Sequence, residues 1–268
     1  MNYFVPRLRL GMMCPPQTTY CDKIGGLPWG LPKKQWPLCR QCRKPLTFNA
    51  QFSHDTSRLN LGAAGRVLFI FTCNHNPGFC DTWEADSGAN AVFFVDGVEL
   101  SKSLTPAPSI STDVEPEGLV FGWRKRKDRI TASEYKRLFD DKTAGLVKYQ
   151  RSISGETKFG GAPLWLQGGC ISLPKPKGKF LLQLNHGHDF EGRPPTAEEL
   201  DVAPSIKGQK FWEYGQHWRR GQIGTNGKPS HISVDKDGTW GCETANFGGG
   251  LAYVFMRKDH SCYMITQN

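Results

Sequence analysis

The sequence lacks the features of membrane and secreted proteins. Its 268 residues contain no apolar run of the length that spans a bilayer, which is about 18 residues or more. Arg7 and Arg9 stand where a secretory peptide has its apolar segment, and no small-residue cleavage site follows. We therefore expect a soluble, cytoplasmic protein.

Cysteine is too scarce for a disulfide scaffold, with 9 residues in the chain. The odd count would leave one thiol over if the others were paired. In a reducing compartment, closely spaced cysteines are more often metal ligands than disulfides.

Acidic residues are in the minority, with 25 Asp and Glu against 34 Lys and Arg and a net charge of +9. The densest basic run, residues 124–129, is typical of a solvated face, and no aromatic-basic binding motif accompanies it. Nucleic acid is therefore not the expected partner. An acidic protein would be attracted by the same positive field.

Helical periodicity is rare, and 30 Gly and 18 Pro interrupt the chain. Residues 133–147 can form a helix capped by Ser133 or Thr131, and 196–202 can form a short capped turn. Aromatic and β-branched runs predict strands at 67–72, 91–95, 180–184 and 251–256. The predicted fold is mainly β (α+β), with a few short helices.

One motif occurs twice. Lys-Ile-Gly-Gly-Leu-Pro at 23–28 returns as Lys-Phe-Gly-Gly-Ala-Pro at 158–163, and each copy is followed by an apolar segment that carries a glutamine, Gln51 or Gln183. The glycine pair and proline are typical of a rigid corner that feeds a strand, and the glutamines are interpreted as buried amides that satisfy backbone groups. A phosphate cradle is the alternative, but neither copy has the P-loop pattern.

The repeat predicts two related β-sheet halves. The first half spans 1–110, a basic and partly helical connector spans 111–155, and the second half spans 156–268. A Gly-led strand follows each glutamine, but the second interval is much longer. We therefore predict a large insertion at 186–240.

The order of these motifs resembles the bacterial YwqG-like family. The resemblance covers 21–98 and 156–257, where the Gly-Gly corner, the strand with its glutamine and the Gly-led strand recur in order. It implies a pseudo-twofold, β-rich fold. It also implies an immunity protein, because members are often encoded beside polymorphic toxins, and a cognate toxin is then the expected partner.

The first half is also similar to the programmed-cell-death-type zinc proteins that chaperone a ribosomal protein. The similar stretch begins at Gly25-Gly26, includes Cys-x2-Cys at 39–42 and Phe-x-Phe-x-Cys at 69–73, and ends at Cys80. This resemblance implies that the module can bind a protein client. The alternative function is therefore a zinc-containing chaperone or adaptor for a nascent ribosomal protein.

Four cysteines have the spacing of a metal knuckle. Cys39 and Cys42 follow a Trp-Pro turn, Cys73 closes a predicted strand, and Cys80 returns after an Asn-Pro-Gly turn. Four thiolates suit a closed, structural zinc site. His75 could replace Cys73 or Cys80, and four unliganded buried thiols are the other alternative. The remaining cysteines lack pairing spacings and are interpreted as ordinary small residues: Cys14, Cys21, Cys170, Cys242 and Cys262.

No catalytic site is predicted, because the chain has no Ser-His-Asp or Cys-His signature. His186, His188 and Asp189 could bind a metal or move protons, but no third ligand cluster accompanies them and they are interpreted as surface residues of a polar loop.

The insertion 186–240 holds the predicted partner-binding residues. Trp, Tyr and Arg dominate protein–protein hot spots, and they gather at 211–220. We expect them to help occlude the active cleft of the toxin; packing of both tryptophans in the core is the alternative. The predicted contact residues are Trp212, Trp218, Arg219 and Arg220.

Overall fold

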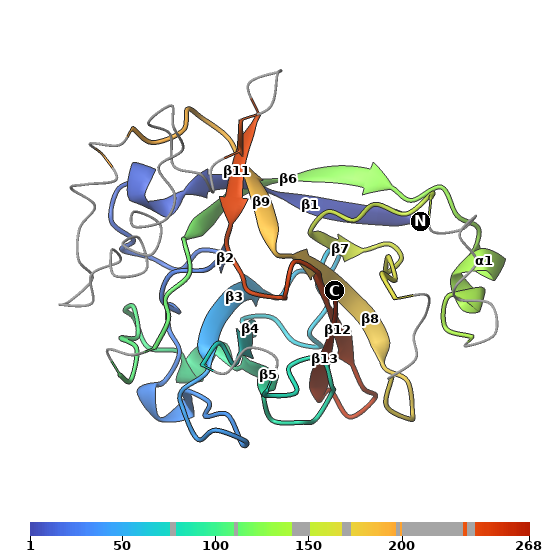
Figure 1. Cartoon of the computed structure of the whole chain (residues 1–268), viewed down its shortest axis with the longest axis horizontal. Helices are drawn as coiled ribbons and strands as arrows, with labels where there is room; N and C mark the ends of the chain where they lie inside the picture. Colours follow the sequence, from blue (N-terminus) through green and yellow to red (C-terminus); the bar gives the residue numbers. More distant parts are fainter. Residues whose placement is uncertain are drawn as a thin grey trace.

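The computed structural model describes residues 1–75, 79–109, 112–140, 151–167, 173–196, 199, 233–234 and 239–268. One ten-stranded sheet dominates this part of the chain (Figure 1), and every neighbouring pair of its strands is antiparallel. Across the sheet the order is β13 (Cys262–Gln267), β12 (Leu251–Met256), β8 (Lys179–Asn185), β7 (Lys158–Gly160), β1 (Asn2–Leu10), β6 (Gly118–Lys127), β2 (Lys23–Ile24), β3 (Thr47–Ser53), β4 (Val67–Thr72) and β5 (Asn90–Val95).

A second, three-stranded sheet lies beside the large sheet, with β9 next to β1. Its order is β10 (Ser233–Val234), β11 (Trp240–Glu243) and β9 (Gly187–Phe190). The helices in the described residues are α1 (Ala132–Arg137) and the 3₁₀ turns η1 (Gly11–Met13), η2 (Lys33–Gln35) and η3 (Gly97–Glu99). No helix in these parts of the chain has the length and apolar character needed to span a membrane.

The large sheet is nearly closed and barrel-like, because its two end strands, β13 and β5, lie against each other (Figure 1). Nearly every strand contributes to one apolar cluster, which includes Leu8, Phe52, Phe159 and Met264 and fills the inside of the sheet. Burying these side chains is the main favourable contribution to folding.

Two further apolar clusters cover the outer face of the sheet. Along β4, Leu68 and Ile70 join the inner cluster, whereas Phe69 and Phe71 join an outer cluster. β12 alternates in the same way between the inner cluster and a second outer one. Both faces of these strands are buried, which explains why they read as continuous apolar runs rather than alternating ones.

The mainly β prediction is confirmed. The runs predicted at 67–72 and 251–256 are β4 and β12, and those at 91–95 and 180–184 lie within β5 and β8. Thr131 caps α1, because its hydroxyl accepts from the Glu134 N–H while the Glu134 carboxylate accepts from the Thr131 N–H. Residues 141–150 and most of 196–202 lie outside the described residues. The predicted domain boundaries stay a prediction.

The pair of β1 and β6, which the sequence did not reveal, joins the two sides of the sheet. It runs from Asn2 opposite Lys127 to Leu10 opposite Gly118. Arg7 pairs with Gly122 and Leu8 with Val120, so Phe121 is the extra residue of a β-bulge. A bulge bends the strand and changes which side chains face inward.

Each Gly-Gly motif forms a tight corner after a short strand. Gly25 and Gly26 have φ of 66° and 69°, and Gly160 and Gly161 have φ of 73° and 68°. A Cβ on Gly25 would lie 2.0 Å from the Pro116 carbonyl oxygen, so glycine is required there for space as well as for conformation. The Gly25 and Gly26 amides already donate to backbone carbonyls, which supports the structural role of the corner over a phosphate cradle.

The two glutamines satisfy backbone groups, as predicted. Gln51 Oε1 accepts from the Trp29 N–H at 2.7 Å, and its Nε2 donates to the Cys21 carbonyl at 3.0 Å. Gln183 Oε1 accepts from the Leu164 N–H at 3.0 Å, and its Nε2 donates to carbonyls of the 154–156 segment. Each amide thereby ties the chain before a corner to the chain after it.

Each corner also covers a buried ion pair. Lys23 and Lys158, the first residues of the two motifs, are both fully buried. Lys23 Nζ donates to Glu117 and Gln17, each at 2.7 Å, and Lys158 Nζ donates to both carboxylate oxygens of Asp128 at 3.0 Å. Burial lowers the pKa of Lys158 to about 8, and Asp128 offsets part of that change. No sequence pattern had indicated this role of the two lysines.

Replacing Lys158 by methionine should strongly destabilise the protein. The variant keeps the length of the side chain but leaves the Asp128 carboxylate buried without its cation. The free energy of unfolding should therefore fall by about 3–5 kcal/mol. Chemical denaturation of wild type and Lys158→Met measures it. The matched control is Arg126→Gln, which removes an exposed contact to Glu156 at 3.4 Å and should cost less than about 1 kcal/mol. Equal losses in the two variants would contradict this role of the pair.

Candidate metal centre

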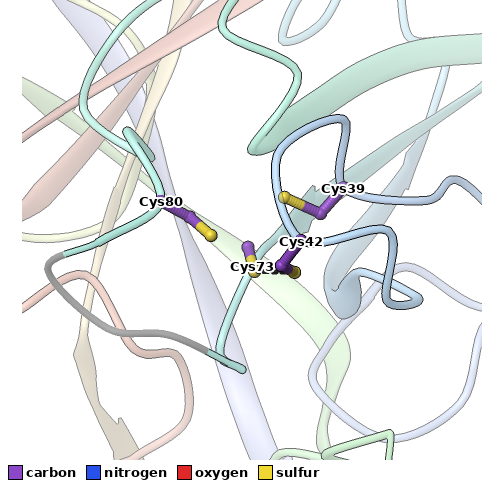
Figure 2. A group of neighbouring side chains, drawn as sticks. All are labelled: Cys39, Cys42, Cys73 and Cys80. Atoms are coloured by element: carbon purple, nitrogen blue, oxygen red, sulfur yellow. Dashed lines mark hydrogen bonds between the residues drawn. The ribbon is translucent and has the colours of Figure 1, made fainter.

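The four predicted cysteines meet at one place. Cys39 and Cys42 lie in the loop between η2 and β3, Cys73 directly follows β4, and Cys80 lies further along the same connection. Their sulfur atoms point toward one another (Figure 2) and all lie within 4.8 Å of one another. The Sγ atoms of Cys42 and Cys73 are 3.6 Å apart.

Backbone hydrogen bonds fold the first loop into a knuckle. The Arg43 N–H donates to the Cys39 carbonyl at 2.9 Å, and the Cys39 N–H donates to the Lys44 carbonyl at 2.8 Å. Arg43 has a φ of 62°, which turns the chain sharply after Cys42. The Lys44 N–H is then directed at the Cys42 sulfur. Both cysteines of the Cys-x2-Cys pair are thereby presented from one turn.

The second loop is fastened to the first by polar contacts. Gln41 Nε2 donates to Asp81 Oδ2 at 2.7 Å, and the Asp81 N–H donates back to Gln41 Oε1 at 3.0 Å. The Arg40 N–H donates to the Gly88 carbonyl at 2.9 Å, and the Cys73 N–H donates to the Ala89 carbonyl at 2.8 Å. These contacts hold the cysteine-bearing loops in place, and the sequence alone did not indicate them.

The cluster is largely withdrawn from water. Cys39, Cys73 and Cys80 are buried and Cys42 is partly exposed. Burial raises the pKa of Cys80 to about 11. Burial also acts to raise the pKa of Cys42, but the Lys44 N–H and the neighbouring thiols outweigh it, so this pKa is lowered.

The donor set fits a divalent ion with tetrahedral preference. Zinc bound to four thiolates at about 2.3 Å places the sulfurs about 3.8 Å apart, and the spacing here, up to 4.8 Å, is close to that. The four cysteines are free rather than disulfide-bonded. Buried thiolates repel one another without a cation, so this chemistry suits a metal better than four unrelated thiols.

His75, the predicted rival ligand, is not part of the cluster. The group of potential ligands in the described residues consists of the four cysteines alone. The Nε2 atom of His75 is buried and has no hydrogen-bond partner among the residues that the structure describes.

The other cysteines lie apart from the centre. Burial raises the pKa of Cys21 to about 11 and that of Cys262 to about 12, and it also raises the pKa values of Cys14 and Cys242. Thiols of this kind are poor nucleophiles. Cys170 lies outside the described residues, as do Trp212, Trp218, Arg219 and Arg220.

The interpretation of residues 186–189 as a surface loop is wrong for His188. Residues 187–190 form β9, and His188 faces inward from it with 8% exposure. Its Nε2 atom lies 2.5 Å from the Thr157 hydroxyl, and its Nδ1 atom lies 2.5 Å from the Thr244 hydroxyl. The imidazole therefore links β9 to the chain around the second corner and to the segment after β11.

The loops of the centre also expose large apolar side chains, which the sequence analysis missed. Leu38, next to Cys39, is 56% exposed, and Phe79, next to Cys80, is 86% exposed. Neighbouring exposed apolar side chains that form one patch can mark an interaction site. Their positions beside the cysteines could have drawn attention to them.

Comparison of the chain with protein-family models, curated proteins and solved structures gave no match.

Acidification should destabilise the protein through His188. Burial first, and then the nearby His186, lowers the pKa of His188 to about 3. The unfolded chain takes up a proton at about pH 6.5, but the folded protein does not, so stability present above that pH is lost below it. Between about pH 7.5 and about pH 5.5 the loss from this group is about 1.4 kcal/mol.

The variant His188→Gln isolates this effect, because glutamine can keep a donor and an acceptor but does not titrate. Urea unfolding at both pH values should show that it loses about 1 kcal/mol less than wild type over the interval. An identical pH dependence in the two proteins would assign the loss to other groups.

Proposed function

We propose that the chain is a cytoplasmic immunity protein that binds a cognate bacterial toxin and occludes its active site. The proposal begins from the resemblance of the repeated corners and strands to the YwqG-like family. It is a binding role without catalysis, and the partner is a protein.

The observation that favours an acidic protein partner is a strip of exposed cations on β1, on β6 and just after β6. Five of them have no ion-pair partner among the residues that the structure describes: Arg9, Arg124, Lys125, Lys127 and Arg129. Unpaired surface charge of one sign accelerates association with an oppositely charged protein and selects against other partners.

This basic strip adjoins the predicted insertion. The chain leaves β9 at Phe190, and the next residue, Glu191, forms a bidentate ion pair with Arg7 of β1, with both N–O distances at 2.7 Å. The predicted contact residues at 211–220 belong to the predicted insertion 186–240 and lie outside the described residues. The basic strip, together with the chain that leaves β9 beside Arg7, is therefore our candidate for the toxin-binding face.

We propose that zinc is the ion of the four-cysteine centre. The sulfur spacing, the burial of three ligands and the Lys44 N–H directed at Cys42 support it. Four protein ligands leave no position for substrate, so the ion would stabilise the fold rather than act on a substrate.

The pseudo-twofold arrangement is also a proposal. Outward from β6 the sheet continues with β2, β3, β4 and β5, and outward from β1 it continues with β7, β8, β12 and β13. The equivalent corners, glutamines and buried lysines described above support a twofold relation about the β1–β6 pair.

A chaperone or adaptor role is the second candidate, and the exposed Leu38 and Phe79 beside the cysteines favour it. An apolar surface there would suit a protein client. The net charge of +9 is unfavourable for a basic ribosomal client.

Metal analysis tests the zinc site. Protein purified under reducing conditions without chelator should contain about one zinc per chain, and Cys42→Ser should lose the metal and several kcal/mol of stability, on the order of 3 or more. Cys14→Ser is the matched control, because Cys14 lies outside the cluster and its partner, the Leu10 carbonyl, also accepts from a serine hydroxyl. Wild-type protein without metal would remove zinc from the proposal.

Co-expression tests the immunity role. The protein should protect bacteria from the toxin encoded at its own locus and should co-purify with it, with a binding free energy on the order of 12 kcal/mol. Alanine at Trp212, Trp218 or Arg219 should weaken binding by about 2 kcal/mol or more and leave the zinc content unchanged.

The outcomes separate the candidate functions. Unfolding of the tryptophan variants would place those side chains in the core and move the interface elsewhere. Binding of a nascent ribosomal protein that is lost in Phe79→Ala would favour the chaperone. Failure of the intact protein to bind or to protect against the toxin would reject the immunity role.

A further inference from the structure

β6 has a free edge over most of its length. β1 pairs with it from Gly118 to Lys127 on one side, whereas β2 on the other side pairs only with Gly118 and Leu119. The Val120 N–H donates to the Asp22 carbonyl at 3.0 Å, and beyond it residues 121–127 form no hydrogen bond on this side within the described chain. Alternate N–H and C=O groups of this segment therefore face outward.

The side chains along the free edge are cationic on both faces. Arg124, Lys125 and Lys127 are exposed and unpaired within the described residues, and Arg126 has only an exposed contact with Glu156 at 3.4 Å. Side chains alternate between the two faces of a strand. A strand with acidic residues would thus meet positive charge on either face.

The aromatic rings beside this edge are not free to stack with bases. The guanidinium carbons of Arg7 and Arg9 lie 4.6 and 4.4 Å from the centroid of the Phe121 ring. The guanidinium carbon of Arg58 lies 4.7 Å from the centroid of the Trp123 ring. Single-stranded nucleic acids bind largely by stacking on open aromatic faces. The arrangement therefore favours a protein over nucleic acid.

A second copy of the chain is also a poor occupant of the edge. Pairing two β6 strands would bring the two cationic segments 124–127 together, and like charges on adjacent strands repel. An acidic extended segment has the opposite charge and offers the same backbone hydrogen bonds.

We propose that residues 121–127 of β6 accept an acidic, extended segment of the toxin as an additional strand of the sheet. This inference rests on the proposed function, because it names the surface through which the toxin is held. Backbone hydrogen bonds hold the added strand, and its carboxylates select this edge by pairing with Arg124 to Lys127.

Charge reversal tests the surface, with the toxin domain encoded at the same locus as the probe. The double variant Arg124→Glu/Lys125→Glu should bind about tenfold more weakly or worse, chiefly through slower association, and the difference should shrink at high salt. Lys33→Glu/Lys34→Glu is the matched control, because it makes the same change of charge at exposed residues of η2. The control should stay within about twofold of wild type.

Hydrogen–deuterium exchange tests the backbone pairing independently of charge. In the free protein the outward amides of 121–127 should exchange fast, and in the complex alternate amides of this segment should become protected. If the toxin binds tightly but these amides stay unprotected, or if both double variants bind it equally well, the inference is wrong while the proposed function stands. No toxin binding by wild type would overturn it together with the proposed function. A labelled single-stranded oligothymidylate serves as the nucleic-acid probe. If the wild-type protein binds it and the Arg124→Glu/Lys125→Glu variant does not, the partner of this edge is nucleic acid rather than a protein.

Discussion

The pairing of β1 with β6 is the constraint on which the rest of the fold depends. These two strands have four strands on each side of them in the sheet. β2 joins the centre by a short pairing with β6, and β7 joins it by a short pairing with β1. Each short strand then turns at a Gly-Gly corner over a buried lysine. The corners depend on β6, because each buried lysine is paired with a carboxylate at one end of that strand. Lys23 pairs with Glu117, which directly precedes β6, and Lys158 pairs with Asp128, which directly follows it.

The strands of the two outer sides could be predicted because both their faces are buried. A strand packed on both sides must be apolar at every position, so the runs at 67–72 and 251–256 stand out in the sequence. β1 and β6 could not be recognised in this way. Pro6, Arg7 and Arg9 interrupt the apolar pattern of β1. A bulge at Phe121 shifts the alternation of β6, and the second half of β6 is basic. Their pairing is a long-range event that no local pattern contains.

The candidate metal centre was predictable for a different reason. Ligand identity and spacing are local properties of the chain, so the spacing of Cys39 and Cys42 alone indicates a knuckle, and the strand before Cys73 indicates where the second pair begins. The contacts that bring the two loops together were not predictable, because Gln41 and Asp81 have no special spacing and meet only once both loops are in place. The inward orientation of His188 escaped prediction as well, since its two threonine partners come from distant segments.

The two outer faces of the sheet show what an ion at the cysteine centre would contribute. In the second half the outer cluster is covered by aromatic side chains, among them Trp165 with Phe139 beside it, and Trp165 is anchored by its Nε1 donating to the Leu138 carbonyl at 2.9 Å. The outer face of β3 and β4 is covered instead by the loops that carry the cysteines, where Trp36 Nε1 donates to the Leu46 carbonyl at 2.9 Å. Hydrogen bonds between Gln41 and Asp81 and from the Arg40 N–H to the Gly88 carbonyl hold these loops together. Four thiolates around one ion would join the same two loops, so an ion bound there would add to these contacts and stabilise the fold.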